Sequence, residues 1–152
     1  MPERHKLIPA SYLVLMKDKK ILLLRRFNTG YRDGEYSFIA GHVEADETFR
    51  QAIVREAKEE AGIVVDGDKL VMAHAMQRSR AGNDADRVDL FFTVTEWQGE
   101  VTNMEPQKCD DLSWFSLDAL PDNIIPYIRQ VIDCIKSGKV YSESGFDLLD
   151  QD

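Results

Sequence analysis

Residues 49–61 constrain the fold of this 152-residue chain most, because helix signals bound them on both sides. Thr48 followed by Gln51 fits a capping box, no Gly or Pro interrupts the segment, and Gly62 suits the position just past a helix end. Strand-like sequence lies before and after this helix. The fold must therefore combine the helix with a sheet.

Two apolar runs before the helix are typical of buried strands. Residues 7–16 and 21–24 are largely apolar, and residues 17–20, Lys-Asp-Lys-Lys, read as a turn, so we expect a β-hairpin. Residues 27–36 contain several Asn, Gly and Asp residues and are expected to form a loop. We expect one short strand over residues 37–40.

The sequence after the helix predicts two further strands. Residues 70–77 are apolar at nearly every position, and apolar and polar residues alternate over 87–95, with the polar loop 79–86 between them. Farther along, a second helix is indicated by apolar residues at helical spacing, with Pro126 in its first turn and Gly138 just past its end. Those apolar residues are Ile124, Ile128, Val131 and Ile135.

This order of elements predicts one mixed α/β domain over residues 1–152. Its fold class is an α/β/α sandwich, a mixed sheet with a helix on each face. The 43% of hydrophobic residues are enough for one sizeable core. The acidic tail, residues 142–152, is expected to be loosely held.

Charge and composition exclude several classes of function. With 27 acidic and 19 basic residues the net charge is −8, so the surface repels nucleic acid and anionic membranes, and an anionic substrate needs local help. Cys109 and Cys134 are too few for a disulfide framework and lack the spacing of a zinc site. No apolar run approaches the roughly 20 residues that span a bilayer. We expect a cytoplasmic protein with neither nucleic-acid nor membrane partners.

The predicted helix gathers three carboxylates on one face. At 100° per residue, Glu56, Glu59 and Glu60 share an arc of about 100°, beside the apolar arc that would pack on the sheet. Like charges four residues apart disfavour a helix, so the cluster does not serve helix stability. Two interpretations compete: a solvated face with an Arg55–Glu59 pair, or a site for a hard cation such as Mg²⁺ or Mn²⁺.

Residues 41–63, GHVEADETFRQAIVREAKEEAGI, resemble the signature of the Nudix hydrolases, G-x5-E-x7-R-E-U-x-E-E-x-G-U with U aliphatic. All seven fixed residues occur in register. The resemblance implies a loop, a helix and a second loop that hold divalent cations, Mg²⁺ or Mn²⁺, against a diphosphate. Ile39-Ala40-Gly41 departs from the Pro-Gly-Gly that often begins the motif, although a carbonyl ligand does not depend on the side chain.

The resemblance also implies roles for individual residues. Arg55 would orient a carboxylate through a salt bridge, and Glu47 would support the junction of loop and helix. The implied metal ligands are the carboxylates of Glu56, Glu59 and Glu60 and the backbone carbonyl of Ala40.

The general base stays open between two residues. Glu56 is one candidate by its place in the motif. Glu105 is the other, because residues 103–109 resemble a segment that brings a further glutamate to the metals in some nucleotide-cleaving relatives; the alternative is an exposed loop acid before a proline.

Two arginines are candidates for binding substrate phosphate. Because side chains alternate along a strand, only one of Arg25 and Arg26 can face the cleft, and Arg26 is similar in place to a strand-end arginine of nucleotide-cleaving relatives. Arg87 is the second candidate, since a guanidinium suits phosphate oxygens. For each, a solvated strand-end cation is the alternative. His42 is left without a role.

Over about residues 10–135 the chain is most similar to small nucleoside-triphosphate pyrophosphohydrolases. This implies a Mg²⁺-dependent (or Mn²⁺-dependent) hydrolase that cleaves a nucleoside or deoxynucleoside triphosphate, its small-molecule partner, to the monophosphate and pyrophosphate. A nucleotide sugar or another nucleoside diphosphate derivative is the alternative substrate, and the motifs of NADH hydrolases are not apparent. A non-catalytic nucleotide-sensing module is a further alternative, which would not need all the acids. The oligomeric state is open, with a homodimer as one option.

Overall fold

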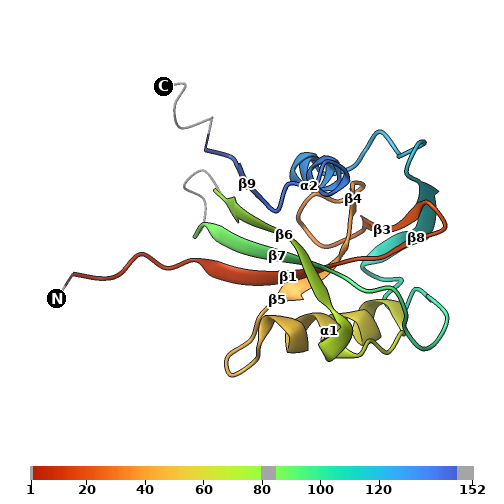
Figure 1. Cartoon of the computed structure of the whole chain (residues 1–152), viewed down its shortest axis with the longest axis horizontal. Helices are drawn as coiled ribbons and strands as arrows, with labels where there is room; N and C mark the ends of the chain where they lie inside the picture. The colour runs from red at the N-terminus through yellow and green to blue at the C-terminus, as the bar shows by residue number, and fades with distance from the viewer. Residues whose placement is uncertain (1, 80–84, 147–152) are drawn as a thin grey trace.

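A computed structural model describes residues 2–79 and 85–146 of the chain. Figure 1 shows a layer of strands with helix α1 on one side and helix α2 on the other. The elements are β1 (Ile8–Val14), β2 (Met16–Lys17), β3 (Lys20–Arg26), β4 (Tyr36–Ser37), β5 (Ile39–His42), α1 (Phe49–Ala61), the 3-10 turn η1 (Gly67–Lys69), β6 (Val71–Arg78), β7 (Arg87–Thr93), β8 (Cys109–Ser116), α2 (Pro126–Lys136) and β9 (Tyr141–Ser144).

The strands form two sheets. The larger one has the order β5-β1-β7-β6-β9 and is mixed, since β1 runs parallel to β7 and β6 parallel to β9, while the other two pairs are antiparallel. The smaller one joins β2, β3 and β4, with β8 paired to β3. The predicted mixed α/β fold, in which strands lie between two helices, is confirmed. None of the helices among the described residues has the length and apolar character needed to cross a bilayer.

The prediction of a hairpin over residues 7–24 is wrong for its first strand. β1 pairs with β5 and β7, and only the two-residue strand β2 forms a hairpin with β3. The prediction of one strand over residues 37–40 is also wrong, because β4 and β5 lie in different sheets, with the buried Phe38 between them. An apolar run predicts a buried strand, but it does not say which strand will be its neighbour.

The C-terminal tail is more ordered than expected over its first residues. β9 pairs parallel with β6, and the buried ring of His74 contacts the Lys139 carbonyl through Nδ1 (2.9 Å) and Ser142 Oγ through Nε2 (2.7 Å). β9 escaped prediction because a short edge strand of Tyr-Ser-Glu-Ser carries little apolar alternation. The rest of the expectation, at residues 147–152, lies outside the described residues.

Two apolar cores hold the layers together, because alternate side chains of a strand face opposite sides of the layer. On β1, Tyr12 and Val14 join the core under α2, whereas Leu13 joins the core under α1. Ile53 of α1 and Ile128 of α2 are fully buried in these cores, and burial of each such side chain contributes roughly 1.5–3 kcal/mol. The cores fix α1 against β1 and β5, where the candidate site lies.

Candidate active site

Helix α1 begins and ends as its sequence predicts. The Thr48 hydroxyl accepts a hydrogen bond from the Gln51 N–H (3.1 Å), and the Gln51 side chain accepts one from the Thr48 N–H (2.9 Å). Gly62 ends the helix with φ 68°, a left-handed conformation that suits glycine. The three alanines and Ile53 of the helix are buried in the core, whereas Glu56 and Glu60 are half-buried and Glu59 is exposed.

The acids of α1 line a cavity of about 420 Å³, which we call the acid pocket. Glu105, from the loop between β7 and β8, reaches the same cavity, as do the cationic side chains of Arg26 and Lys108. The structure therefore brings together residues that the sequence places far apart. The lining residues are Leu24, Arg26, Asn28, Thr29, Glu56, Glu59, Glu60, Glu105, Lys108, Cys109 and Leu112.

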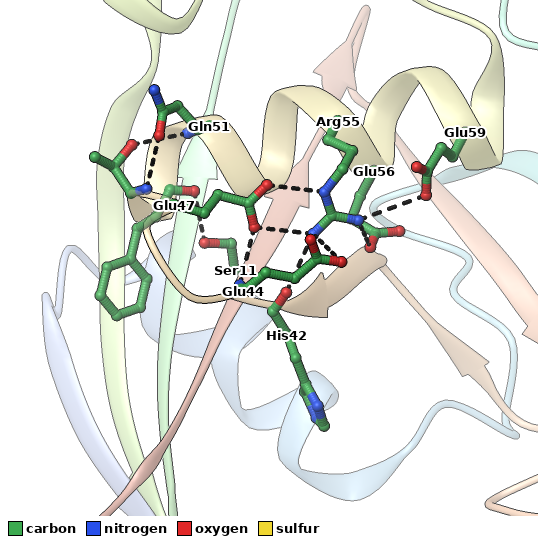
Figure 2. Close-up of polar contacts among 10 residues, drawn as sticks. Ser11, His42, Glu44, Glu47, Gln51, Arg55, Glu56 and Glu59 are labelled. Atoms are coloured by element: carbon green, nitrogen blue, oxygen red, sulfur yellow. Dashed lines mark hydrogen bonds and ion pairs between the residues drawn. The ribbon is translucent and has the colours of Figure 1, made fainter.

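Arg55 is the centre of the ion pairs beside this pocket (Figure 2). Its guanidinium donates twice to Glu47, at 2.8 and 3.0 Å, and once to Glu56 Oε1, at 2.6 Å, and lies 3.5 Å from Glu59 Oε2. The predicted Arg55–Glu59 pair is thus one contact of a larger cluster. The bonds to Arg55 lower the pKa of Glu47 to about 2, so Glu47 stays ionised and holds Arg55 in place.

The backbone of β5 faces the same acids. Glu60 Oε2 accepts a hydrogen bond from the Ala40 N–H (3.0 Å), and the His42 carbonyl accepts one from Arg55 (3.2 Å). In an antiparallel pair a residue exchanges both of its backbone bonds with its partner or neither, so the Ala40 carbonyl also points away from its partner Tyr12, toward α1. The ring of His42 points away from Arg55 (Figure 2).

Gly41 lets Glu56 approach the strand closely. A Cβ at this position would lie 2.2 Å from Glu56 Oε1 and 2.4 Å from Glu56 Cδ, closer than any real contact. The first glycine of the motif therefore leaves room for a carboxylate rather than serving a turn, since its φ is not positive.

Burial and mutual repulsion disfavour the charged forms of these acids. Burial raises the pKa of Glu60 well above its ordinary value, and the nearby charges of Glu56 and Glu105 raise it further. Burial also raises the pKa of Glu56, although the bond to Arg55 opposes this. A cation bound among these acids would relieve both effects.

The donor set fits a hard divalent cation, since carboxylate and carbonyl oxygens are the ligands that Mg²⁺ prefers. Within residues 2–79 and 85–146, no three His, Cys, Asp or Glu side chains converge as they stand into a group that could hold a metal ion.

Of the two arginines at the end of β3, Arg26 lines the acid pocket and Arg25 does not. Arg26 lines the acid pocket, but its guanidinium already donates to the Tyr31 carbonyl (2.7 Å) and to Thr29 Oγ1 (3.1 Å), within the loop that follows β3. Arg25 leaves the pocket and pairs with Asp110 (2.7 Å). Arg26 therefore fixes its own loop as well as lining the cavity.

Arg87 lies in a second cavity of about 310 Å³, which we call the arginine–tyrosine pocket. Arg87 is only 5% exposed and does not line the acid pocket. Arg26, at the boundary, lines both cavities, so one elongated molecule could occupy the two together. The lining residues are Ala10, Tyr12, Arg26, Tyr31, Ala40, Gly41, His42, Arg78, Arg87 and Tyr127.

The sequence analysis gave no role to Arg78 or Tyr127, which shape this second pocket. Arg78 stacks on the Tyr127 ring at 4.0 Å and donates to Asp89 Oδ2 (2.9 Å), and Asp89 is fully buried. One signal was present: Asp89 and Arg78 are charged residues within strands, and a charged side chain that is buried there needs a partner.

A family model described as the NUDIX domain matches residues 6–133. Curated relatives include proteins named NAD-capped RNA hydrolase NudC. The one from Pseudomonas aeruginosa is 31% identical over 116 residues, which are 76% of this chain and 38% of that protein. The one from Escherichia coli is 29% identical over 113 residues, 74% of this chain and 40% of that protein. The chain thus spans less than half the length of these relatives.

Solved structures share the fold. The crystal structure of a MutT NUDIX hydrolase from Burkholderia pseudomallei matches with a TM-score of 0.78 at 24% identity, over 85% of this chain and 98% of that one. The solution structure of the E. coli ORF135 protein matches with a TM-score of 0.73 at 27% identity, over 88% and 91%.

Proposed function

The chain belongs to the NUDIX family, and from that premise we propose that it is a divalent-metal-dependent pyrophosphohydrolase of nucleoside or deoxynucleoside triphosphates. The products would be the nucleoside monophosphate and pyrophosphate. One observation carries the proposal: the motif acids Glu56, Glu59 and Glu60 line a pocket that adjoins a second pocket of arginine and tyrosine side chains.

We assign the metal to the carboxylates of Glu56, Glu59 and Glu60 and the carbonyl of Ala40. A bound Mg²⁺ would neutralise charge on the phosphate oxygens and lower the pKa of a bound water. Arg55 orients Glu56, because it holds one carboxylate oxygen at 2.6 Å.

Glu105 is our proposed general base. Its carboxylate makes no hydrogen bond or ion pair within the described residues, whereas Glu56 is held by Arg55. It would accept the proton of the attacking water as the water oxygen bonds to a phosphorus of the α–β anhydride. The bridging P–O bond then breaks, and its electron pair leaves with the departing phosphate group.

The arginine–tyrosine pocket would take the nucleoside. Aromatic rings and a stacked guanidinium bind the face of a planar base, and guanidinium donors suit ring nitrogen and carbonyl acceptors. Arg26, shared by both pockets, lies where the phosphates would pass from one to the other. Its hydrogen bonds to Tyr31 and Thr29 let Arg26 support this boundary. Arg87 would contact the substrate from the pocket that takes the nucleoside.

A substrate screen tests the proposal. Purified protein is incubated with each common nucleoside and deoxynucleoside triphosphate, with Mg²⁺ and separately with Mn²⁺, and pyrophosphate and orthophosphate are measured apart. We expect pyrophosphate with an equal amount of monophosphate, lost in the Glu59→Gln and Glu60→Gln variants. Orthophosphate alone rejects cleavage to the monophosphate and pyrophosphate, and no turnover of any triphosphate rejects this substrate class.

The names of the curated relatives favour a second candidate. They are named NAD-capped RNA hydrolases, so the screen includes NAD and a short NAD-capped RNA. Cleavage of the diphosphate would yield nicotinamide mononucleotide and AMP from NAD, and nicotinamide mononucleotide and a 5′-monophosphate RNA from the capped RNA. These names also count against our expectation that nucleic acid is not a partner. A preference for NAD over every triphosphate would favour this candidate.

Nucleotide sugars, the alternative substrates, complete the screen. A non-catalytic module that only senses nucleotides would bind a nucleotide of the screen without hydrolysing it. A single domain over residues 1–152 stays a prediction, and a homodimer stays one option for the oligomeric state. Sedimentation velocity and limited proteolysis of the full chain test them.

A further inference from the structure

The loop between β7 and β8 places Glu105 at the acid pocket, although the carboxylates of α1 repel its negative charge. Glu105 lines this pocket with Glu56, Glu59 and Glu60, and its charge is among the causes that raise the pKa of Glu56 and of Glu60. Like charges repel more strongly where water is partly excluded, so without a cation Glu105 is pushed away from the helix. The backbone around Glu105 must resist this repulsion.

Both ends of this loop are bonded to the framework of the site. The Thr102 and Met104 N–H groups donate to the carbonyls of Ala61 (2.9 Å) and Glu60 (3.2 Å), at the C-terminal end of α1. At the other end, the Phe27 N–H, just past β3, donates to the Lys108 carbonyl (2.9 Å). Figure 1 shows the loop passing beside the end of α1.

The side-chain amide of Asn103 closes the loop on itself. Its Oδ1 accepts a hydrogen bond from the Glu105 N–H (3.1 Å), and its Nδ2 donates to the Cys109 carbonyl (2.7 Å). The Glu105 carbonyl accepts from the N–H groups of Lys108 and Cys109, both at 2.9 Å. Both backbone polar groups of Glu105 are therefore fixed, and Asn103 supplies the only side chain in this set of bonds.

We propose that Asn103 is a positioning residue, whose amide holds Glu105 at the acid pocket. The inference deepens the proposed function, because it names the residue that keeps the proposed base in place. Aspartate could not replace Asn103, since a carboxylate cannot donate to the Cys109 carbonyl and would add a further negative charge beside the acids. Alanine removes both bonds and leaves the backbone contacts to α1 and β3.

A double-mutant cycle over Asn103→Ala and Glu105→Gln tests the proposal, because a residue that acts only through another has no effect once the other is removed. We expect Glu105→Gln to lower kcat roughly a hundredfold, as loss of a general base does. Asn103→Ala should lower kcat about tenfold in the wild-type chain and less than twofold in the Glu105→Gln chain, with KM little changed.

The same four proteins are titrated with Mn²⁺ alone and followed by electron paramagnetic resonance, which needs no turnover. Asn103→Ala should weaken Mn²⁺ binding several-fold when Glu105 is present and not when it is glutamine. Gln107→Ala is the matched control, because it removes an exposed amide from the same turn that makes no hydrogen bond within the described residues. It should leave kcat and Mn²⁺ binding unchanged.

Two results would overturn the proposal. One is an equal loss of kcat from Asn103→Ala in the wild-type chain and in the Glu105→Gln chain, which indicates a purely structural loop residue. The other is a Mn²⁺ affinity that Glu105→Gln leaves unchanged. Thermal melting of each variant shows whether a loss follows unfolding. If the effect of Asn103→Ala on Mn²⁺ binding depends on Glu105 but no nucleotide is hydrolysed, Asn103 is supported as the positioning residue and the proposed function is rejected. If a nucleotide is hydrolysed but the effects of Asn103→Ala and Glu105→Gln on kcat are additive, the proposed function is supported and the role of Asn103 is rejected.

Discussion

Replacing Gly41 by alanine should damage the site while sparing the fold. The new Cβ would lie 2.2 Å from Glu56 Oε1, whereas ordinary contacts begin at 3.4 Å, so the carboxylate must move by about 1 Å. A displacement of that size in a positioned group can lower a rate about a hundredfold, which corresponds to about 2.7 kcal/mol of transition-state stabilisation. It would also break the 2.6 Å bond between Arg55 and Glu56.

The stability of the Gly41→Ala variant should change little. Gly41 has no positive φ, so alanine fits the backbone, and such a replacement typically stabilises a fold by about 0.4–1 kcal/mol through the unfolded chain. This offsets part of the lost contact with Arg55. We therefore expect a kcat about a hundredfold lower at saturating Mg²⁺, with a urea midpoint close to that of the wild type.

Gly67→Ala is the control for this prediction. It also adds a methyl group at a glycine without positive φ, but the new Cβ would lie 3.6 Å from Val54 Cγ2, an ordinary contact away from the acid pocket. Its kcat should match the wild type. A Gly41→Ala enzyme with a kcat within twofold of wild type would show that Glu56 needs no such close approach and would refute the reasoning.

Three further predictions follow from the acids and from Arg55. Mg²⁺ should stabilise the wild type against urea, by about 2.7 kcal/mol at a concentration of 100 Kd, and EDTA should abolish the gain; Glu60→Gln should show no gain. Arg55→Lys should lower kcat at least tenfold, because an ammonium cannot donate twice to Glu47 as the guanidinium does, whereas Arg50→Lys on the same helix should not. Because Arg55 lowers the pKa of Glu47 to about 2, ionised Glu47 stabilises the fold above about pH 4.5, and this contribution is lost as the pH falls toward 2. The gap between the urea midpoints of wild type and Glu47→Gln should therefore narrow as the pH falls from about 4.5 toward 2; a constant gap over this range would contradict this.

The local elements were predictable because their signals are local. The cap at Thr48 and the glycine at 62 bound α1 at the residues expected, and the strands on either side of residues 79–86 lie as predicted. Pairing was not predictable, because β1 has the same apolar alternation whether it pairs with β3 or with β7. The change of sheet at Leu15 and again at Phe38 is decided by tertiary packing.

In the candidate site, too, residues close in sequence were predictable and residues brought together by strand pairing or by loops were not. The spacing of Glu56, Glu59 and Glu60 places them together on a helix, so the sequence alone could gather them. The arrival of Glu105 rested on resemblance, and the place of Arg87 in the neighbouring pocket depends on the pairing of β6 with β7. Asn103 had no signal, because an asparagine in a loop is common and its two partners are backbone groups.

β5 lies at the end of the larger sheet, and a strand in that place offers a row of N–H and C=O groups to which a strand of another molecule could add. Here Glu60 occupies the N–H of Ala40, and Arg55 occupies the carbonyl of His42. The side chains proposed for chemistry therefore also close the sheet against intermolecular pairing. Substitutions that release these two backbone groups would risk aggregation as well as lost turnover.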